Sequence, residues 1–172
     1  MSTLIRWQSR GVYSHAAFLM RSGLIVESWQ GAGVRIKDLS DWQDIDAFTI
    51  PGMTPAQWDD AIAFALDQLG KGYDYLGVLR FVSRQRGSAD LDRWFCSELV
   101  FAALQSVGVS PFARIEPWAV APSLLAISPL LEPVAVSGPD ECRKCFGKLG
   151  YFEIPGKICT ACLAKEISKT LP

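Results

Sequence analysis

Residues 93–100 read Arg93-Trp94-Phe95-Cys96-Ser97-Glu98-Leu99-Val100, and they place a lone cysteine directly before a dense apolar run. The run continues to Gly108, and glycine commonly follows the last turn of a helix, so we predict a helix that begins near Cys96. The unpaired N–H groups and the dipole at a helix N-terminus favour the thiolate, the reactive form of cysteine. Cys96 is therefore a candidate nucleophile, although a cysteine before an apolar helix can also simply fill the core.

The composition is that of a folded protein of ordinary size. The chain has 172 residues, of which 49% are apolar, enough for one domain with a real core and a small appendage. A net charge of −1 gives no sign of a nucleic-acid-binding surface. No stretch approaches the roughly 18 apolar residues of a transmembrane helix. Because Arg6 and Arg10 interrupt any apolar signal-peptide core, we expect a cytoplasmic protein, and release by lysis would leave no trace in the sequence.

Strand patterns precede helix patterns along the chain. Apolar runs at 12–20 and 24–29 flank the turn residues 21–23, which predicts a hairpin. Further strands are expected at 34–37, at 45–50 and, after the helices, at 131–136. This order predicts an α+β fold in which an antiparallel sheet packs on helices.

The clearest predicted helix runs from Thr54 to Gly70. Thr54-Pro55-Ala56-Gln57 has the pattern of a capping box with proline at the first helical position. Spacing along this helix places Trp58, Ile62, Leu66 and Leu69 on one face. Residues 71–75 are then expected to form a loop, and shorter helices are expected at 76–82 and 122–126.

The chain contains a single histidine, His15, on the first predicted strand. A strand histidine is often structural, but a nucleophilic cysteine needs a base, and this sequence has no other imidazole. In the predicted hairpin Ala17 lies opposite Glu27, and the period of two then makes His15 and Glu27 diagonal neighbours on one face. Glu27 is therefore the candidate group that orients the base. A shift of one residue would bring Ser28 or Gln30 there instead and leave Glu27 as an exposed carboxylate.

Several short motifs surround these candidates. They are Tyr13-Ser14-His15-Ala16-Ala17, Ile25-Val26-Glu27-Ser28, Gly72-Tyr73-Asp74-Tyr75, Phe95-Cys96-Ser97-Glu98-Leu99-Val100 and Ala121-Pro122-Ser123-Leu124-Leu125. Together they resemble the circularly permuted papain-like amidases, a superfamily that includes NlpC-like bacterial cell-wall peptidases and lecithin–retinol acyltransferase. In permuted members histidine precedes cysteine, as His15 precedes Cys96 here, whereas papain has the opposite order.

The resemblance implies a permuted papain-like catalytic domain over residues 1–136. Within it Cys96 would be the nucleophile, His15 the general base and acid, and Glu27 the group that orients His15. The implied activity is hydrolysis of an amide bond in cell-wall peptides through an acyl-enzyme. The superfamily also contains lipid acyl hydrolases and acyltransferases, so that activity is an alternative. A third alternative is a non-catalytic interaction protein that depends on zinc.

The sequence departs from the family pattern directly before the cysteine. Relatives often have tyrosine there, whereas this chain has Phe95, so a hydroxyl near the substrate is either missing or supplied by Tyr73 or Tyr75. We therefore expect Tyr73, Tyr75 and Phe95 to line the substrate site. The N-terminal region is also short, so the groove walls of the relatives do not carry over directly.

The other four cysteines are crowded near the end of the chain. They form two C-x₂-C pairs, Cys142 with Cys145 and Cys159 with Cys162, with thirteen residues between the pairs. Four thiolates on two such turns suit one tetrahedral zinc ion, and a site filled by protein ligands is structural, not catalytic. Disulfides are the alternative, which a reducing compartment disfavours. We predict a linker and zinc-ribbon-like module over residues 137–172, whose partner is unknown, and no cofactor for catalysis.

Overall fold

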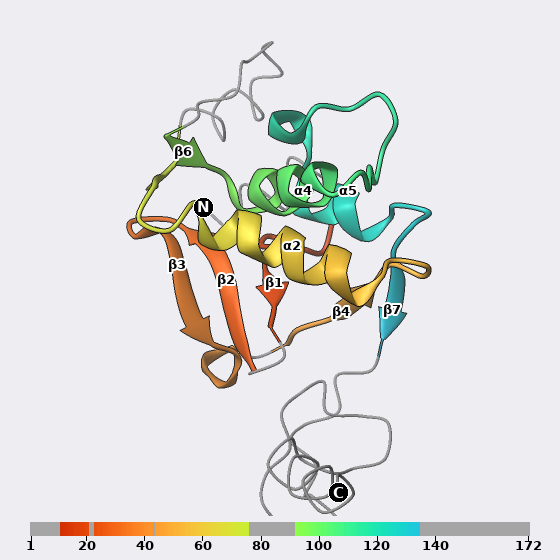
Figure 1. The fold of residues 1–172 in the computed structure, drawn as a ribbon. Helices are drawn as coiled ribbons and strands as arrows, with labels where there is room; N and C mark the ends of the chain where they lie inside the picture. The colour runs from red at the N-terminus through yellow and green to blue at the C-terminus, as the bar shows by residue number, and fades with distance from the viewer. Residues whose placement is uncertain (1–10, 21–22, 43, 76–91, 135–172) are drawn as a thin grey trace, which may run out of the picture.

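The computed structural model describes residues 11–20, 23–42, 44–75 and 92–134 (Figure 1). The elements in these ranges are β1 (Phe18–Leu19), β2 (Leu24–Trp29), β3 (Gly33–Asp38), the 3₁₀ helix η1 (Leu39–Asp41), β4 (Ala47–Thr49), α2 (Pro55–Leu66), β5 (Gly72–Tyr73), β6 (Arg93–Trp94), α4 (Cys96–Ser106), the 3₁₀ helix η2 (Pro117–Ala119), α5 (Pro122–Ala126) and β7 (Glu132–Val134). The predicted α+β class with antiparallel strands is confirmed. In the part of the chain that the structure describes, no helix has the length and apolar character needed to cross a membrane.

The central sheet has the strand order β1-β2-β3, and both pairings are antiparallel. Phe18 pairs with Val26 and Leu19 with Ile25, which is the predicted register, since one further pair would place Ala17 opposite Glu27. On the other side of β2, Glu27 pairs directly with Arg35 of β3. Glu27 therefore lies between the chain segment that precedes β1 and the third strand.

The first predicted strand, 12–20, is wrong in its extent, because only Phe18 and Leu19 pair with β2. The residues before them are tied to α5 instead of to the sheet. The Tyr13 N–H donates to the Ser123 hydroxyl oxygen at 2.9 Å, and the Ser123 hydroxyl donates to the Tyr13 carbonyl at 2.9 Å. A side chain from a distant helix thus satisfies both backbone groups of Tyr13, which have no need of a strand partner.

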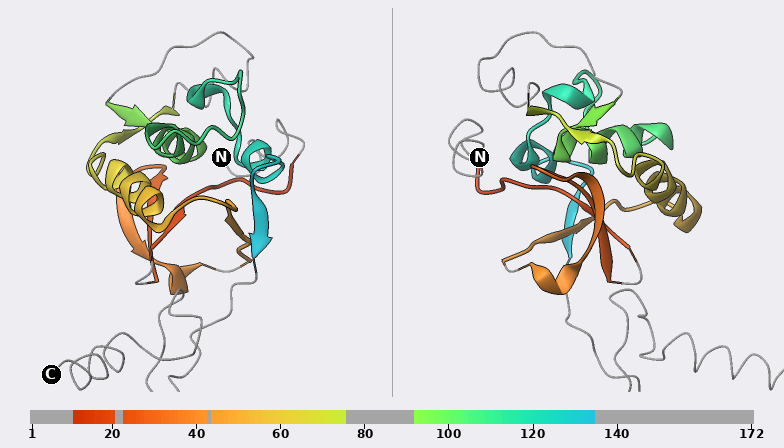
Figure 2. Two further views of the ribbon diagram at one scale, coloured as in Figure 1. Left: turned by 45° about the vertical axis from the view of Figure 1, so that its right-hand side comes forward. Right: turned by 90° about the vertical axis from the view of Figure 1, so that its left-hand side faces the viewer.

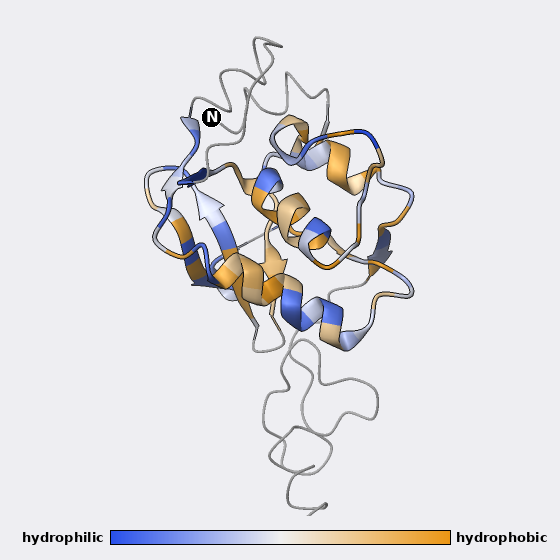
Figure 3. Ribbon diagram, turned by 45° about the horizontal axis from the view of Figure 1, so that its top comes forward, coloured by the Kyte–Doolittle hydropathy of each residue, from blue (hydrophilic) through white to orange (hydrophobic). Residues whose placement is uncertain are grey.

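Helix α2 begins as predicted, with the Thr54 side chain and the Gln57 side chain forming a capping box. It ends at Leu66 and not near Leu69, which is exposed. Its fully buried residues are Ala61 and Ala65, while the larger residues Trp58, Ile62 and Leu66 are only partly buried around them. Trp58, Ile62 and Leu66 thus share the core-facing side of the helix, and two small side chains form its centre. Figure 3 shows that α2 changes from hydrophilic at its start to hydrophobic in its second half.

Helix α4 runs beside α2, and both helices pack against β2 (Figures 1 and 2). Val26 on β2 and Leu99 on α4 belong to the same buried core as the alanines of α2. The predicted end of α4 is confirmed, because Gly108 follows the last turn with a φ of +78°. The sheet, α2 and α4 thus form one packed unit that fixes the position of the first residue of α4, Cys96.

Two short pairings complete the described structure. β4 and β7 are antiparallel and lie inside the predicted strands 45–50 and 131–136. Residues 71–75 do not form the predicted loop alone, because Gly72 and Tyr73 of β5 pair in parallel with Arg93 and Trp94 of β6. A two-residue strand whose partner is distant in sequence leaves no periodicity to detect. The predicted helix 76–82, residues 135–136 of the last predicted strand and the zinc-binding module lie outside the described residues.

A close backbone approach joins β3 to the turn that follows α2. Gly33 has a φ of +70°, and a Cβ added there would lie 2.0 Å from the carbonyl oxygen of Lys71. The next residue, Val34, donates its N–H to that same oxygen at 2.9 Å, and the Val34 carbonyl accepts the Gly70 N–H at 3.0 Å. Only glycine provides both this conformation and this space.

Candidate active site

His15 is held between a buried carboxylate and two indole rings. Its Nε2 lies 2.7 Å from Oε2 of Glu27, whose side chain is 0% exposed, while 18% of the His15 side chain is exposed. The imidazole stacks on Trp42 with ring centroids 5.1 Å apart and an interplanar angle of 1°, and it makes a T-shaped contact with Trp29 at a centroid distance of 5.2 Å. The ring therefore has one fixed orientation, in which Nε2 faces Glu27.

Cys96 is the first residue of α4 and is 1% exposed. The start of the helix is fixed by the Glu98 carboxylate, which accepts the Phe95 N–H at 3.2 Å, and by the Ser97 hydroxyl, which donates to the Val120 carbonyl. Glu98 thus helps to fix the helix start, as expected for a carboxylate in the first turn. Cys96 is therefore almost completely enclosed by its neighbours.

The Cys96 thiol and the His15 imidazole are hydrogen-bonding neighbours. Burial alone would lower the pKa of His15, but the hydrogen bonds and negative charges of Cys96 and Glu27 outweigh it and raise the pKa to about 9. An ionised carboxylate only accepts hydrogen bonds, so Nε2 carries a proton toward Glu27, and Nδ1 is the nitrogen that remains for the thiol. The predicted neighbours His15, Glu27 and Cys96 are therefore brought together, although their roles stay predictions.

Arg35 is the charged neighbour that the sequence analysis missed. Its Nε lies 2.9 Å and its Nη2 2.8 Å from Oε1 of Glu27, the oxygen that His15 does not use. Burial alone would raise the pKa of Glu27, but the hydrogen bonds and positive charges of His15 and Arg35 lower it below its ordinary value. The sequence did contain a signal for this contact. If the predicted strands 24–29 and 34–37 are paired with each other, Arg35 is a cation that can lie opposite Glu27.

Tyr73 and Phe95 line the buried side of the cysteine. They form one cluster with Cys96, with Tyr73 and Phe95 ring centroids 6.0 Å apart. Burial, followed by the negative charge of a Cys96 thiolate, raises the pKa of Tyr73 far above its ordinary range, so its hydroxyl stays protonated and can donate. Tyr75 packs on Tyr73 at 5.0 Å but is 43% exposed. Of the three residues predicted to line the substrate site, Tyr75 thus offers the most accessible surface.

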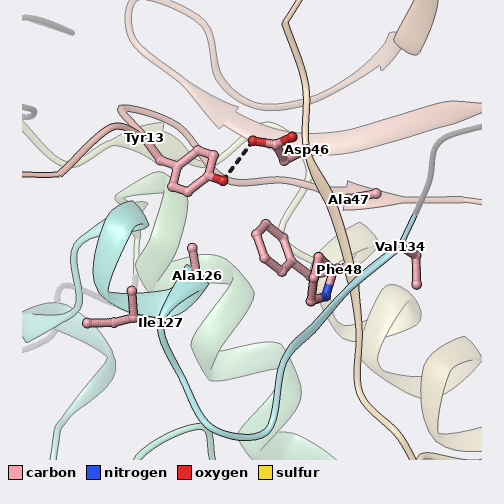
Figure 4. A pocket seen from close by; sticks show the side chains of 8 residues that line it. Tyr13, Asp46, Ala47, Phe48, Ala126, Ile127 and Val134 are labelled. Atoms are coloured by element: carbon pink, nitrogen blue, oxygen red, sulfur yellow. Dashed lines mark hydrogen bonds between the residues drawn. The ribbon is translucent and has the colours of Figure 1, made fainter.

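A pocket of about 360 Å³ lies apart from these residues (Figure 4). Its walls come from the segment before β1, from the β4–β7 pair and from the end of α5, and they include Tyr13, Phe48 and Ile127. The Tyr13 hydroxyl donates to Asp46 at 2.7 Å across its rim. None of the residues predicted for the active site lines this pocket.

The predicted metal ligands, Cys142, Cys145, Cys159 and Cys162, lie outside the described residues. Within the described ranges, no group of three or more His, Cys, Asp or Glu side chains could hold a metal ion. The neighbours His15, Glu27 and Cys96 carry side chains that can transfer a proton and make a nucleophilic attack. A thiol beside a hydrogen-bonded imidazole at a helix N-terminus is suited to that chemistry.

Sequence comparison finds a similarity to a protein named as a probable peptidase. The chain is 28% identical over 138 residues to the probable lipoprotein peptidase YaeF of Escherichia coli (strain K12). The similarity points to a peptidase. It covers 60% of this chain and 50% of the relative, so the chain spans about half the length of the protein that it matches. No protein-family model matches the chain. At a coarse level, this similarity supports peptidase or amidase chemistry.

Proposed function

We propose that the protein is a cysteine peptidase or amidase in which Cys96 is the nucleophile. His15 serves as general base and acid, and Glu27 orients it. One observation carries the proposal: the only imidazole of the chain contacts a fully buried carboxylate on one side and the thiol at the start of α4 on the other. The similarity to a probable peptidase supports the same class of reaction.

The proposed reaction begins with proton transfer from the Cys96 thiol to Nδ1 of His15. The pair then carries a thiolate and an imidazolium, and the raised pKa of His15 favours the imidazolium at neutral pH. The thiolate attacks the substrate carbonyl carbon, and the carbonyl electron pair moves to its oxygen. When this tetrahedral species collapses, His15 donates its proton to the leaving nitrogen, and a thioester to Cys96 remains. Water, deprotonated by His15, then hydrolyses the thioester and restores the thiol.

The start of α4 also supplies a donor for the oxyanion. The first N–H groups of a helix have no partner within the helix, and they lie at the positive end of its dipole. The Cys96 N–H belongs to this set. Such donors act on the charge that develops in the transition state, and removal of one typically costs about 10²–10³ in rate.

The substrate that we propose is an amide bond in a peptide, with bacterial cell-wall peptides as the first class to test. We assign this activity to a permuted papain-like domain over residues 1–136. The exposed ring of Tyr75 packs on Tyr73, which belongs to the same cluster as Cys96, and it offers a surface against which a peptide can pack. The relative that the chain matches is itself named a lipoprotein peptidase, which agrees with a peptide substrate.

The experiment is incubation of the protein with cell-wall peptide fragments and, separately, with acyl esters. We expect cleavage of peptide amides, a thioester on Cys96 visible by mass spectrometry, and loss of both in Cys96→Ser and His15→Ala. Lys37→Met, which changes an exposed residue paired with Asp41, should cleave like the wild type. Cleavage of esters without peptides would replace the amidase with a lipid acyl hydrolase. If the wild type cleaves neither class, the catalytic proposal is wrong.

We further propose that residues 137–172 form a linker and a module built around one structural zinc ion. The two C-x₂-C pairs Cys142/Cys145 and Cys159/Cys162 supply the four thiolates that tetrahedral zinc prefers. Thiolate ligation of this kind suits a reducing compartment, in line with the proposed cytoplasmic location. Metal analysis of the full chain should find about one zinc ion per chain, and the double substitution Cys142→Ser with Cys145→Ser should abolish binding.

A further inference from the structure

We propose that Arg35 is a positioning residue for the Cys96–His15 pair and that it acts through the charge of Glu27. This inference rests on the proposed function and adds to it a fourth residue, which no comparison and no sequence motif assigns. It starts from the contacts on the two carboxylate oxygens of Glu27. Oε2 faces His15 at 2.7 Å, while Oε1 faces two nitrogens of the Arg35 guanidinium at 2.8 and 2.9 Å.

His15 and Arg35 bind different oxygens of the Glu27 carboxylate, so each has its own role. Glu27 is fully buried, and a buried carboxylate with a single partner tends to hold its proton and become neutral. A protonated Glu27 would offer its own O–H and would no longer require Nε2–H of His15 to point toward it. The guanidinium, which stays charged in proteins, keeps Glu27 ionised and therefore fixes which nitrogen of His15 faces Cys96.

A charge count shows why the thiolate depends on Arg35. In the reactive state the chain of contacts runs from Arg35⁺ to Glu27⁻, His15⁺ and Cys96⁻, and the four charges sum to zero. Without Arg35 the same state would carry one net negative charge in a buried site. Burying an uncompensated charge is costly, so the thiol would ionise only at higher pH.

The titratable groups around the Arg35–Glu27–His15–Cys96 contacts lie on β2, β3, β5 and α4 and on the segment before β1. Among the described residues, the charged groups that act on Glu27 are His15 and Arg35, and those that act on His15 are Cys96 and Glu27. Tyr73 belongs to the same buried cluster as Cys96, and the charged groups that act on it are Cys96, Tyr75 and Asp74. Arg35 is the only cation besides His15 among these groups.

The position of Arg35 is itself held by the fold. Residue 35 lies directly opposite Glu27 in the β2–β3 register. Its guanidinium carbon lies 5.1 Å from the centre of the Trp29 ring, a cation–π contact. The same indole makes T-shaped contacts with both His15 and Trp42. Because the side chain is 29% exposed, substitution there does not open a cavity in the core.

The test measures how alkylation of Cys96 by iodoacetamide depends on pH, followed by mass spectrometry of the full-length protein. We expect Arg35→Met and Arg35→Gln to move the midpoint of the alkylation profile upward by about one pH unit or more. Arg35→Lys keeps the charge but loses one of the two contacts. Its midpoint should therefore lie close to that of the wild type, with most of the upward shift absent. Lys37→Met removes a cation from the same strand, but its partner is Asp41, so its midpoint should equal that of the wild type.

A second background shows whether Arg35 acts through Glu27. In Glu27→Gln the carboxylate is absent, so adding Arg35→Met should cause no further upward shift of the midpoint. An additional shift of the same size would mean that Arg35 acts on the thiol directly, and it would overturn the inference. So would an unchanged midpoint in both Arg35→Met and Arg35→Gln, with circular dichroism showing that at least one of them is folded. If the wild-type thiol ionises like a free cysteine, the proposed function itself fails.

Discussion

At the scale of single residues, His15 is the centre of the candidate site and the only histidine of the chain. Its imidazole resonances can therefore be followed by NMR without assignment. We expect the wild-type imidazole to titrate near pH 9, because Cys96 and Glu27 raise its pKa. Cys96→Ala and Glu27→Gln should each bring the midpoint down, since each removes one of these partners. A wild-type midpoint near 6.5 would contradict the described contacts.

The same pKa shift predicts a pH dependence of stability. The folded pKa of His15 lies above its unfolded value, so the stabilisation from the protonated ring is fully present below about pH 6.5. It is lost as the pH rises through about 9. The free energy of unfolding, measured by urea titration, should therefore fall between these pH values in the wild type. His15→Gln should lack that fall, and an equal fall in both proteins would show that other groups cause it.

Residue-level prediction from the sequence succeeded where one local rule applied. The proximity of His15 and Glu27 followed from the hairpin register and the period of two. Arg35 was missed because its contact with Glu27 depends on the register between β2 and β3. The sequence predicted the third strand but not its register with the second. The stacking of Trp42 on His15 could not be predicted, since Trp42 follows an irregular 3₁₀ turn without periodicity.

At the scale of elements, Ser123 is the contact that holds the histidine-bearing segment. It bonds both backbone groups of Tyr13 and so connects α5 to the residues just before His15. Ser123→Ala should lower the free energy of unfolding by about 1–2 kcal/mol, because the partly buried N–H and carbonyl groups of Tyr13 lose their partner. It should also slow alkylation of Cys96, because the segment that carries His15 is no longer held. Ser110→Ala is the matched control, since Ser110 makes an exposed hydrogen bond to the Phe112 carbonyl. Equal effects of the two substitutions would contradict the role of Ser123.

The contact between β3 and the turn after α2 gives a second prediction at this scale. Gly33→Ala must place a methyl group against the Lys71 carbonyl and also adopt a left-handed conformation, so it should cost about 3 kcal/mol or more. Gly52 has a similar φ of +82° but no atom within 4 Å of an added Cβ. Gly52→Ala should therefore cost only the backbone strain, about 1 kcal/mol. Thermal unfolding of the two variants measures the difference, and similar costs would count against the close approach.

The sequence predicted elements well where capping and termination signals were local. The capping box at Thr54 and the glycine after α4 are examples. It failed where neighbours from elsewhere decide the outcome. The buried face of α2 is centred on Ala61 and Ala65 because α4 packs close there, and β5 forms only because β6 lies beside it.

At the scale of the whole molecule, the proposal divides the chain into a catalytic domain and a metal-bound tail. A strong chelator should therefore remove about one zinc ion per chain and leave the alkylation profile of Cys96 unchanged. The reason is that every residue in the chain of contacts from Arg35 to Cys96 precedes residue 137. Zinc content is measured by atomic spectroscopy and the thiol by mass spectrometry. A loss of Cys96 reactivity in step with zinc would show that the two parts depend on each other.

The hydrogen bonds between Tyr13 and Ser123 span 110 positions of the chain, and this has a consequence for biosynthesis. A ribosome translates His15, Glu27, Arg35 and Cys96 before it reaches the serine that anchors the first of them. A nascent polypeptide of about a hundred residues therefore contains His15, Glu27, Arg35 and Cys96, but not Ser123, which holds the backbone beside His15. The candidate site would thus reach its described geometry only after residue 123 has been synthesised.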